Sequence, residues 1–238
     1  MSLIKRLTLE IDLKFNKVSF LTTVFPMNES YICDFFDSLI NQTYKNFDIV
    51  VINDGFEKFD RIKKEYHHNL NIIEVKYSDT PAKNKEYGIN YCIDQKYDFL
   101  IFGDSDDYFQ KNRIKKSLEF LKKADVVVND LSLFNIDGVF KEKYISHRIN
   151  NLENIDLEFI KDKNIFGMSN TAINLRKLTK VFFDDKIVAV DWYFFKGLLE
   201  KGLKAIFTNE TITYYRQHEK NTIGLSTKKN VYKLWWEK

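Results

Sequence analysis

Four consecutive polar residues, Asp104-Ser105-Asp106-Asp107, directly follow an apolar stretch with the composition of a buried β-strand. In an open α/β sheet, ligands bind beyond the carboxyl ends of the strands, so acidic side chains at such an end lie where a substrate is expected. Carboxylate oxygens are ligands that Mg²⁺ or Mn²⁺ prefers, and these ions also bridge to phosphate oxygens. The placement of this tetrad therefore predicts a metal site that receives a diphosphate.

Two further acidic residues stand where predicted elements end or begin. Asp54 follows a strand at 47–53, and Asp191 opens a helix at 192–201. Each also has an ordinary structural explanation, because Asp is common in turns and as a helix cap. If these residues converge with the tetrad, a metal there would stabilise the negative charge that grows on a departing diphosphate. Asp184-Asp185 is a rival source of an acid–base carboxylate, but it falls in a loop.

Strand-like and helix-like segments alternate along the first half, which predicts an α/β fold with a mainly parallel central sheet and helices on both faces. The expected strands are at 18–22, 47–53, 72–75 and 98–103, and the expected helices are at 31–40, 82–95 and 114–121, with an amphipathic stretch at 59–66. The second half reads as α+β, with strands at 125–128 and 131–134, a hairpin signal at 135–138 and a helix near 154–162.

Composition excludes several classes of protein. The 238 residues include 37 basic and 34 acidic ones, a net charge of +3, and the basic residues are scattered, so a nucleic-acid groove is not indicated. Cys33 and Cys92 fall on apolar helix faces, and we expect reduced thiols there. The four histidines are not spaced from the two cysteines in the way that a zinc site requires, so a zinc site is not expected.

The sequence also indicates where the protein works. No apolar run reaches the ~18 residues of a membrane span, and the start lacks the apolar core of a secretory signal. We therefore expect a cytoplasmic protein. Trp235-Trp236 in the tail fits a peripheral contact with the inner face of the cell membrane, with packing of the tail on its own domain as the alternative.

Several short motifs follow one another between Val18 and about Gly224. They are Phe25 with Asn28-Glu29, Asn41-Gln42-Thr43-Tyr44, Val51-Ile52-Asn53-Asp54-Gly55, Ala82-Lys83-Asn84, the tetrad at 104–107, Val190-Asp191-Trp192 and Tyr215-Arg216-Gln217-His218. In these motifs the chain resembles the bacterial family 2 glycosyltransferases, which are inverting enzymes of the Rossmann-like GT-A fold. The number of motifs in the right order makes the resemblance specific.

The resemblance implies roles for individual residues. Phe25 would lie against the nucleotide base, and Asp54 would accept a hydrogen bond from the pyrimidine N–H. Asp106 would bind Mn²⁺ or Mg²⁺. Asp191 would be the general base that deprotonates the acceptor hydroxyl.

The remaining residues of the implied site surround the donor. Lys83 would lie near the diphosphate and Asp104 toward the ribose, and His218 would add a ligand to the metal or the diphosphate. Four more residues complete the expected donor-binding set, namely Thr23, Asn28, Ser105 and Arg216. The stretch at 166–174 would line the acceptor.

The chain departs from the family pattern in three places. Thr23 to Asn28 replaces the usual Pro-Thr-Tyr-Asn, Lys83 replaces an Arg that could bind bidentately, and Val190 replaces a Glu beside the expected base. These changes imply lower activity or an unusual acceptor.

The resemblance implies a metal-dependent transferase that moves a sugar from a UDP- or dTDP-linked donor to a hydroxyl of a glycan or lipid-linked acceptor in surface polysaccharide synthesis. We expect one domain at 15–224, with a nucleotide-sugar-binding half at 15–112, a smaller acceptor half at 113–224 and a tail at 225–238. A sugar-1-phosphate nucleotidyltransferase is an alternative, although the loop at 22–30 lacks the Gly that such an enzyme uses. A non-catalytic nucleotide-sugar-binding subunit is another, motivated by Val190 and Lys83.

Overall fold

The structure is a computed structural model, and it describes residues 16–161, 163–184, 187 and 189–218. The tail predicted at 225–238, the end of the family resemblance between residue 219 and about Gly224, and Asp185 lie outside the described residues. The bounds of the domain and its two halves remain predictions.

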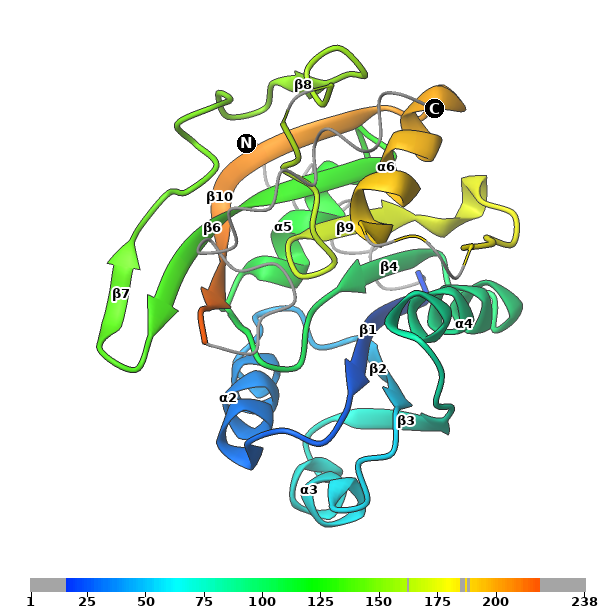
Figure 1. Cartoon of the computed structure of the whole chain (residues 1–238), viewed down its shortest axis with the longest axis vertical. Helices are drawn as coiled ribbons and strands as arrows, with labels where there is room; N and C mark the ends of the chain where they lie inside the picture. The colour runs from blue at the N-terminus through cyan, green and yellow to red at the C-terminus, as the bar shows by residue number, and fades with distance from the viewer. Residues whose placement is uncertain (1–15, 162, 185–186, 188, 219–238) are drawn as a thin grey trace, which may run out of the picture.

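One mixed sheet runs through the described chain in the order β3-β2-β1-β4-β9-β6-β10-β5 (Figure 1). Its strands are β1 (Val18–Val24), β2 (Asp48–Asn53), β3 (Asn71–Lys76), β4 (Phe99–Phe102), β5 (Tyr108–Phe109), β6 (Val126–Asn135), β9 (Thr171–Asn174) and β10 (Ala205–Arg216), and β7 (Gly138–Lys141) and β8 (Asn154–Ile155) pair with β6 and β10. The first four along this order are parallel, as are β6 and β10. Only β9 runs against its neighbours β4 and β6 within this central part of the sheet.

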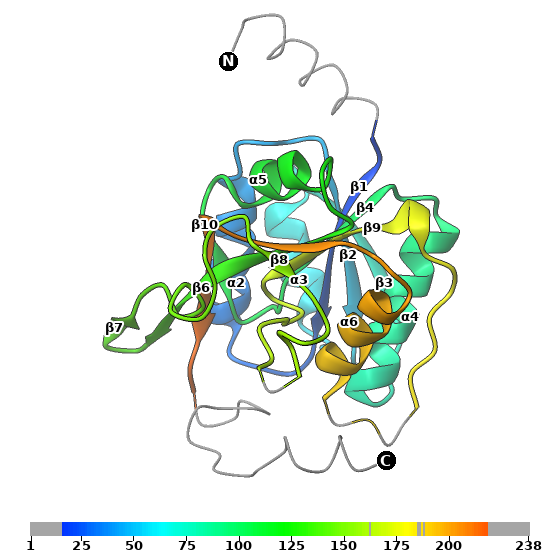
Figure 2. The same ribbon diagram turned by 90° about the horizontal axis from the view of Figure 1, so that it is seen from above.

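Helices cover both faces of the sheet, as the alternation predicted (Figure 2). On one face lie α2 (Glu29–Ile40), α3 (Phe59–Tyr66) and α5 (Arg113–Phe120), and on the other lie α4 (Pro81–Asp94) and α6 (Val190–Glu200). Successive residues of a strand point to opposite faces. Phe20 of β1 accordingly packs into the hydrophobic core on the side of α2, α3 and α5, and Leu21 packs into the core on the side of α4 and α6.

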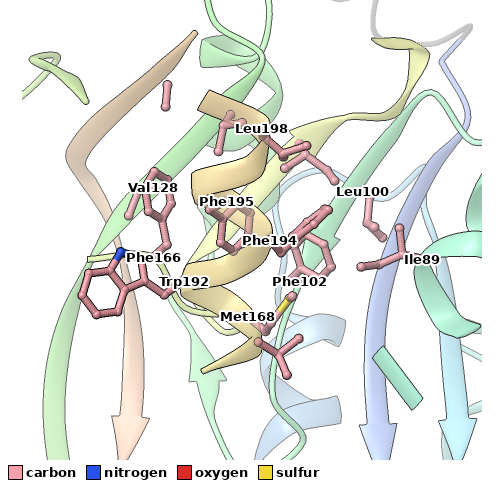
Figure 3. Packing of buried hydrophobic residues seen from close by; sticks show 14 of the residues in the cluster. Ile89, Leu100, Phe102, Val128, Phe166, Met168, Trp192, Phe194, Phe195 and Leu198 are labelled. Atoms are coloured by element: carbon pink, nitrogen blue, oxygen red, sulfur yellow. The ribbon is translucent and has the colours of Figure 1, made fainter. Parts of the chain in front are cut away.

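Aromatic packing fixes α6 against β4 (Figure 3). The ring of Phe102, the last residue of β4, lies 6.4 Å from that of Phe194 and 6.1 Å from that of Phe195, with the rings nearly perpendicular. Phe195 also stacks on Phe166, at 4.9 Å between centroids. The first turn of α6 is thereby held near the carboxyl end of β4.

The helix expected near 154–162 was wrong. Asn154-Ile155 forms β8, which pairs antiparallel with the start of β10, and turns follow it. The apolar spacing suggested a helix, but here Ile155 and Ile160 are buried from a strand and a turn instead. Pairing with a distant strand decided the local structure, which a local pattern does not report.

Three other features of the described residues bear on the earlier expectations. The hairpin at 135–138 is confirmed as the connection between β6 and β7. Both cysteines are free thiols, Cys92 buried and Cys33 only partly so. Within the described residues, no helix combines the length and the apolar character that crossing a membrane requires.

Gly103 joins β4 to the acidic tetrad at a point with no room for a side chain. A Cβ atom there would lie 2.4 Å from Phe20 Cε1 and 2.6 Å from Phe109 Cζ. We expect Gly103→Ala to lower the free energy of unfolding by about 1–3 kcal/mol, because the two rings must move. Urea denaturation measures this, with Gly197→Ala in α6 as the matched control. A Cβ at 197 meets no atom within 4 Å, and that variant should gain up to about 1 kcal/mol from helix propensity. Equal effects of the two substitutions would contradict the packing argument.

Candidate active site

The acidic tetrad forms a turn at the end of β4, beside the end of β1. Its turn closes with a 3.1 Å hydrogen bond from the Asp107 amide to the Asp104 carbonyl. The Ser105 hydroxyl donates to the Thr23 carbonyl oxygen at 2.7 Å, and so ties the turn to β1. Ser105 is buried. Thr23 and Ser105 therefore meet in the structure, through a contact that shapes the loop.

Asp107 is fully buried and anchors the turn to the second half of the chain. Its carboxylate accepts hydrogen bonds from the Ser169 hydroxyl and, at 2.8 Å, from the Arg216 amide. Burial and the charges of Asp106 and Asp104 raise the pKa of this carboxyl, and the two hydrogen bonds act in the opposite direction while giving its buried oxygens partners. They leave Asp104 and Asp106 as the two partly exposed carboxylates of the tetrad.

Asp106 and His218 come together, although they are far apart in sequence. The distance between Asp106 Oδ2 and His218 Nε2 is 2.9 Å, and the two side chains are 20% and 25% exposed. Among the described residues, no three His, Cys, Asp or Glu side chains are grouped as a ready-made metal cage. Mg²⁺ and Mn²⁺ need no such cage, since they take further ligands from water and phosphate. One carboxylate and one imidazole fit a cation shared with a diphosphate.

Asp191 lies in the first turn of α6, close enough to Asp104 for its charge to affect the pKa of that residue. The helix is capped by Ala189, so the alternative explanation of Asp191 as a helix cap was wrong. Asp191 Oδ1 is 2.9 Å from Lys85 Nζ, and Oδ2 accepts a 3.0 Å hydrogen bond from the Met168 amide. The carboxylate is therefore held in one orientation from two sides, while its side chain stays 28% exposed.

The positively charged side chain beside Asp191 is that of Lys85, which the sequence analysis missed. Lys83 Nζ instead donates to the Phe183 carbonyl at 2.7 Å and to Glu86 at 3.1 Å, where it joins α4 to the loop before α6. A signal for Lys85 exists in the sequence: it falls on the helix face of Ala82, Ile89 and Cys92, all of which are buried. A charged residue on an otherwise apolar helix face calls for a buried partner. The donor-binding role assigned to Lys83 remains a prediction.

Asp54, Phe25 and Asn28 surround the ends of β1 and β2. Asp54 accepts hydrogen bonds from the Ser78 hydroxyl and, at 2.9 Å, from Asn84 Nδ2, so its carboxylate is pinned to the start of α4. Asn28 caps α2 by accepting from the Ser30 amide at 3.1 Å. The ring of Phe25 is 46% exposed. An open pocket of about 450 Å³ adjoins these residues, lined by Pro26 to Asn28 and Gly55 to Lys58.

The charges of Lys85 and of the nearby aspartates shift the pKa values of Asp104 and Lys85. Burial raises the pKa of Asp104 to about 6; the positive charge of Lys85 opposes this, and the charges of Asp106 and Asp191 add to it. Burial alone would lower the pKa of Lys85, but the charges of Asp191 and Asp104 outweigh it and raise that pKa. Burial, together with Asp107 and the other three aspartates, also holds the pKa of the Tyr215 hydroxyl well above its usual range. Lys85 and Tyr215 thus lie within the field of the predicted aspartates.

The raised pKa of Asp104 has a consequence for stability. In metal-free protein the unfolded chain releases this proton near the ordinary pKa of 3.8 and the folded chain near 6, so the contribution of Asp104 to stability declines as pH rises between those values. We expect the stability of Asp104→Asn, relative to wild type, to increase from pH 4 to pH 6 and then to level off. Urea denaturation of both proteins in the presence of a chelator measures the difference. A difference in the free energy of unfolding between the two proteins that stays constant from pH 4 to pH 6 would contradict the raised pKa of Asp104.

Comparison with known proteins identifies the family and the fold. A family model described as "Glycosyl transferase family 2" matches residues 20–207. The chain is 26% identical to the glycosyltransferase GlyA of Streptococcus pneumoniae over 219 residues, which cover 84% of this chain and 30% of GlyA. It is 27% identical over 187 residues to an Escherichia coli protein, the UDP-Glc:alpha-D-GlcNAc-diphosphoundecaprenol beta-1,3-glucosyltransferase WfaP, covering 76% of this chain and 70% of that one. The chain thus spans less than a third of GlyA.

Among solved structures, Staphylococcus aureus TarS 1–349 in complex with UDP-GlcNAc matches with a TM-score of 0.66 and 19% identity, covering 87% of this chain and 60% of TarS 1–349. This match and the mainly parallel central sheet show an α/β fold of the GT-A type. The chain belongs to glycosyl transferase family 2.

Proposed function

We propose that the protein transfers one sugar, with inversion at the anomeric carbon, from a UDP- or dTDP-sugar to a hydroxyl of a glycan or lipid-linked acceptor, and that it requires Mn²⁺ or Mg²⁺. The observation that carries the proposal is the position of Asp191. Its charge, like that of Asp106, acts on Asp104, and its carboxylate is fixed by Lys85 and the Met168 amide. A base must be held in this way if it is to meet an acceptor hydroxyl beside a bound donor.

In the proposed reaction, Asp106 and His218 would hold the cation, and Asp104 would face the ribose. When bound, a divalent ion would supply positive charge to a leaving diphosphate. Asp191 takes the proton of the acceptor hydroxyl while its oxygen forms a bond to the anomeric carbon, and the bond from that carbon to the diphosphate oxygen breaks. Lys85 holds Asp191 in one orientation before the acceptor arrives, and its charge favours an anionic donor.

The predicted contacts with the pyrimidine base of the nucleotide belong to the same proposal. Asp54 would accept the pyrimidine N–H, and its bonds to Asn84 and Ser78 fix the carboxylate in place. Uracil and thymine share that N–H, so both donor classes fit. The neighbouring pocket and the exposed ring of Phe25 offer the base a surface to stack on.

The relatives support the acceptor class. WfaP is named for a UDP-glucose donor and a lipid-linked acceptor, and TarS was crystallised with UDP-GlcNAc. By this analogy the protein acts in bacterial surface polysaccharide synthesis, in the cytoplasm or at the inner face of the cell membrane. Membership of family 2 disfavours the nucleotidyltransferase alternative. A subunit without turnover is the remaining competitor.

Purified protein mixed with a panel of UDP- and dTDP-sugars tests the proposal. We expect one donor to raise the melting temperature only when Mn²⁺ or Mg²⁺ is present, and to be hydrolysed slowly without an acceptor. Stabilisation without hydrolysis or transfer would favour the non-catalytic subunit. Exchange that depends on pyrophosphate would favour a nucleotidyltransferase.

A further inference from the structure

The guanidinium group of Arg216 is occupied by contacts within the protein. Its Nη2 donates to Asp34 Oδ2 at 2.6 Å, and its Nε donates to the Asp106 carbonyl oxygen at 2.7 Å. The group lies 4.2 Å from the ring centre of Tyr31 and 4.4 Å from that of Phe134. Only 11% of the side chain is exposed. This geometry is that of an anchor between elements.

Tyr31 and Asp34 are three residues apart on α2, so both reach the same neighbour across the helix surface. Tyr31 also faces His218, at 5.7 Å between ring centroids. His218 lies two residues after Arg216, the last residue of β10, and the Gln217 amide between them donates to the Phe134 carbonyl oxygen at 2.8 Å, which holds the chain beside β6. The anchoring of Arg216 therefore determines where the His218 ring lies.

We propose that Arg216 is a positioning residue that holds His218 and the main chain of Asp106 in place for the metal, with Tyr31, Asp34 and Phe134 as its anchor. This inference rests on the proposed function, because it concerns the cation assigned to Asp106 and His218. It replaces the donor contact that the sequence predicted for Arg216. The anchor also makes α2, which carries none of the proposed ligands, part of the support of the site.

Arginine suits this task better than lysine. The Asp34 carboxylate is 52% exposed, so the ion pair alone stabilises little. The planar guanidinium can stack against two rings while donating in its own plane to a carboxylate and a carbonyl. A lysine at this position would keep the charge and lose both the stacking and one of the two hydrogen bonds.

Titration of the full chain with Mn²⁺ in the presence of UDP, followed by the electron paramagnetic resonance of free Mn²⁺, tests the inference without an activity assay. We expect Arg216→Lys to raise the Mn²⁺ dissociation constant about 10-fold, the lower end of what loss of a supporting residue costs a metal site. His218→Ala should do at least as much, and Arg216→Lys added to it should change binding by clearly less than about 10-fold, since the part of its effect that acts through His218 is already lost. Tyr31→Phe should keep wild-type affinity and Tyr31→Ala should not.

Arg148→Lys is the matched control, because Arg148 also stacks on a tyrosine ring, that of Tyr144, on a segment without proposed ligands. Unchanged Mn²⁺ affinity in Arg216→Lys, with a raised KM for the donor, would overturn the inference and make Arg216 a donor contact. Failure of the proposed function looks different: wild-type protein with UDP would bind no Mn²⁺, which overturns the metal assignment and this inference together.

Discussion

Replacing Asp191 by Asn is expected to lower kcat for sugar transfer about 1000-fold, within the range that a general base contributes. The amide has nearly the shape of the carboxylate and can still accept the hydrogen bond from the Met168 amide. It cannot take a proton from the acceptor hydroxyl. The loss should therefore fall on the chemical step, with the affinity for the nucleotide sugar little changed.

Two measurements separate these effects. Steady-state kinetics with the identified donor give kcat, and the shift in melting temperature with UDP and Mn²⁺ reports donor binding. Asp184→Asn is the matched control, because Asp184 belongs to the rival pair of carboxylates and should keep most of its turnover. A variant at 191 that retains a tenth of wild-type kcat would remove Asp191 from the role of base.

Replacing Asp106 by Asn is expected to act earlier, on the binding of donor and metal. The substitution removes the negative charge of the carboxylate that contacts His218. We expect kcat/KM for the donor to fall on the order of 100-fold, which corresponds to about 2.7 kcal/mol. Excess Mn²⁺ should restore part of the loss, whereas no concentration of metal should rescue Asp191→Asn.

Wild-type protein treated with a chelator should reproduce the defect of Asp106→Asn and recover when Mn²⁺ is returned. Asp137→Asn, at the tip of the β6–β7 hairpin, is a control of equal chemistry on a distant loop. If chelation leaves transfer unchanged, the protein needs no divalent cation, and the roles of Asp106 and His218 have to be reassigned.

The first half of the fold could be predicted because local patterns determine it. Each strand there is a short apolar run followed by an amphipathic helix, and β1, β2 and β4 pair as parallel neighbours. The second half depends on distant pairing. β8 formed where a helix was expected, and β9 lies between β4 and β6, whose positions in the chain say nothing of it.

The site could be predicted in part for the same reason. The positions of Asp104, Asp106 and Asp191 follow from strand ends and a helix start, and the structure brings these three together, while their chemical roles await the experiments above. Lys85 was missed because motif matching favoured Lys83, and a helix turns the two side chains about 200° apart. The anchoring of Arg216 was missed because Asp34, in the same helix as Tyr31, lies 182 residues away from it in the sequence.

The reversed direction of β9 gives the site a modular design. A strand that runs against its neighbours begins where they finish, so the residues just before it, Met168 and Ser169, meet Asp191 and Asp107 through hydrogen bonds. Those contacts use a main-chain amide and one small hydroxyl. The exposed side chains of the long connection that leads to them from the hairpin can therefore vary, provided that buried ones such as Phe166, which stacks on Phe195, are kept. We expect that exchanging those exposed side chains between homologues would change the proposed acceptor preference and leave the contacts of Asp191 and Asp107 in place.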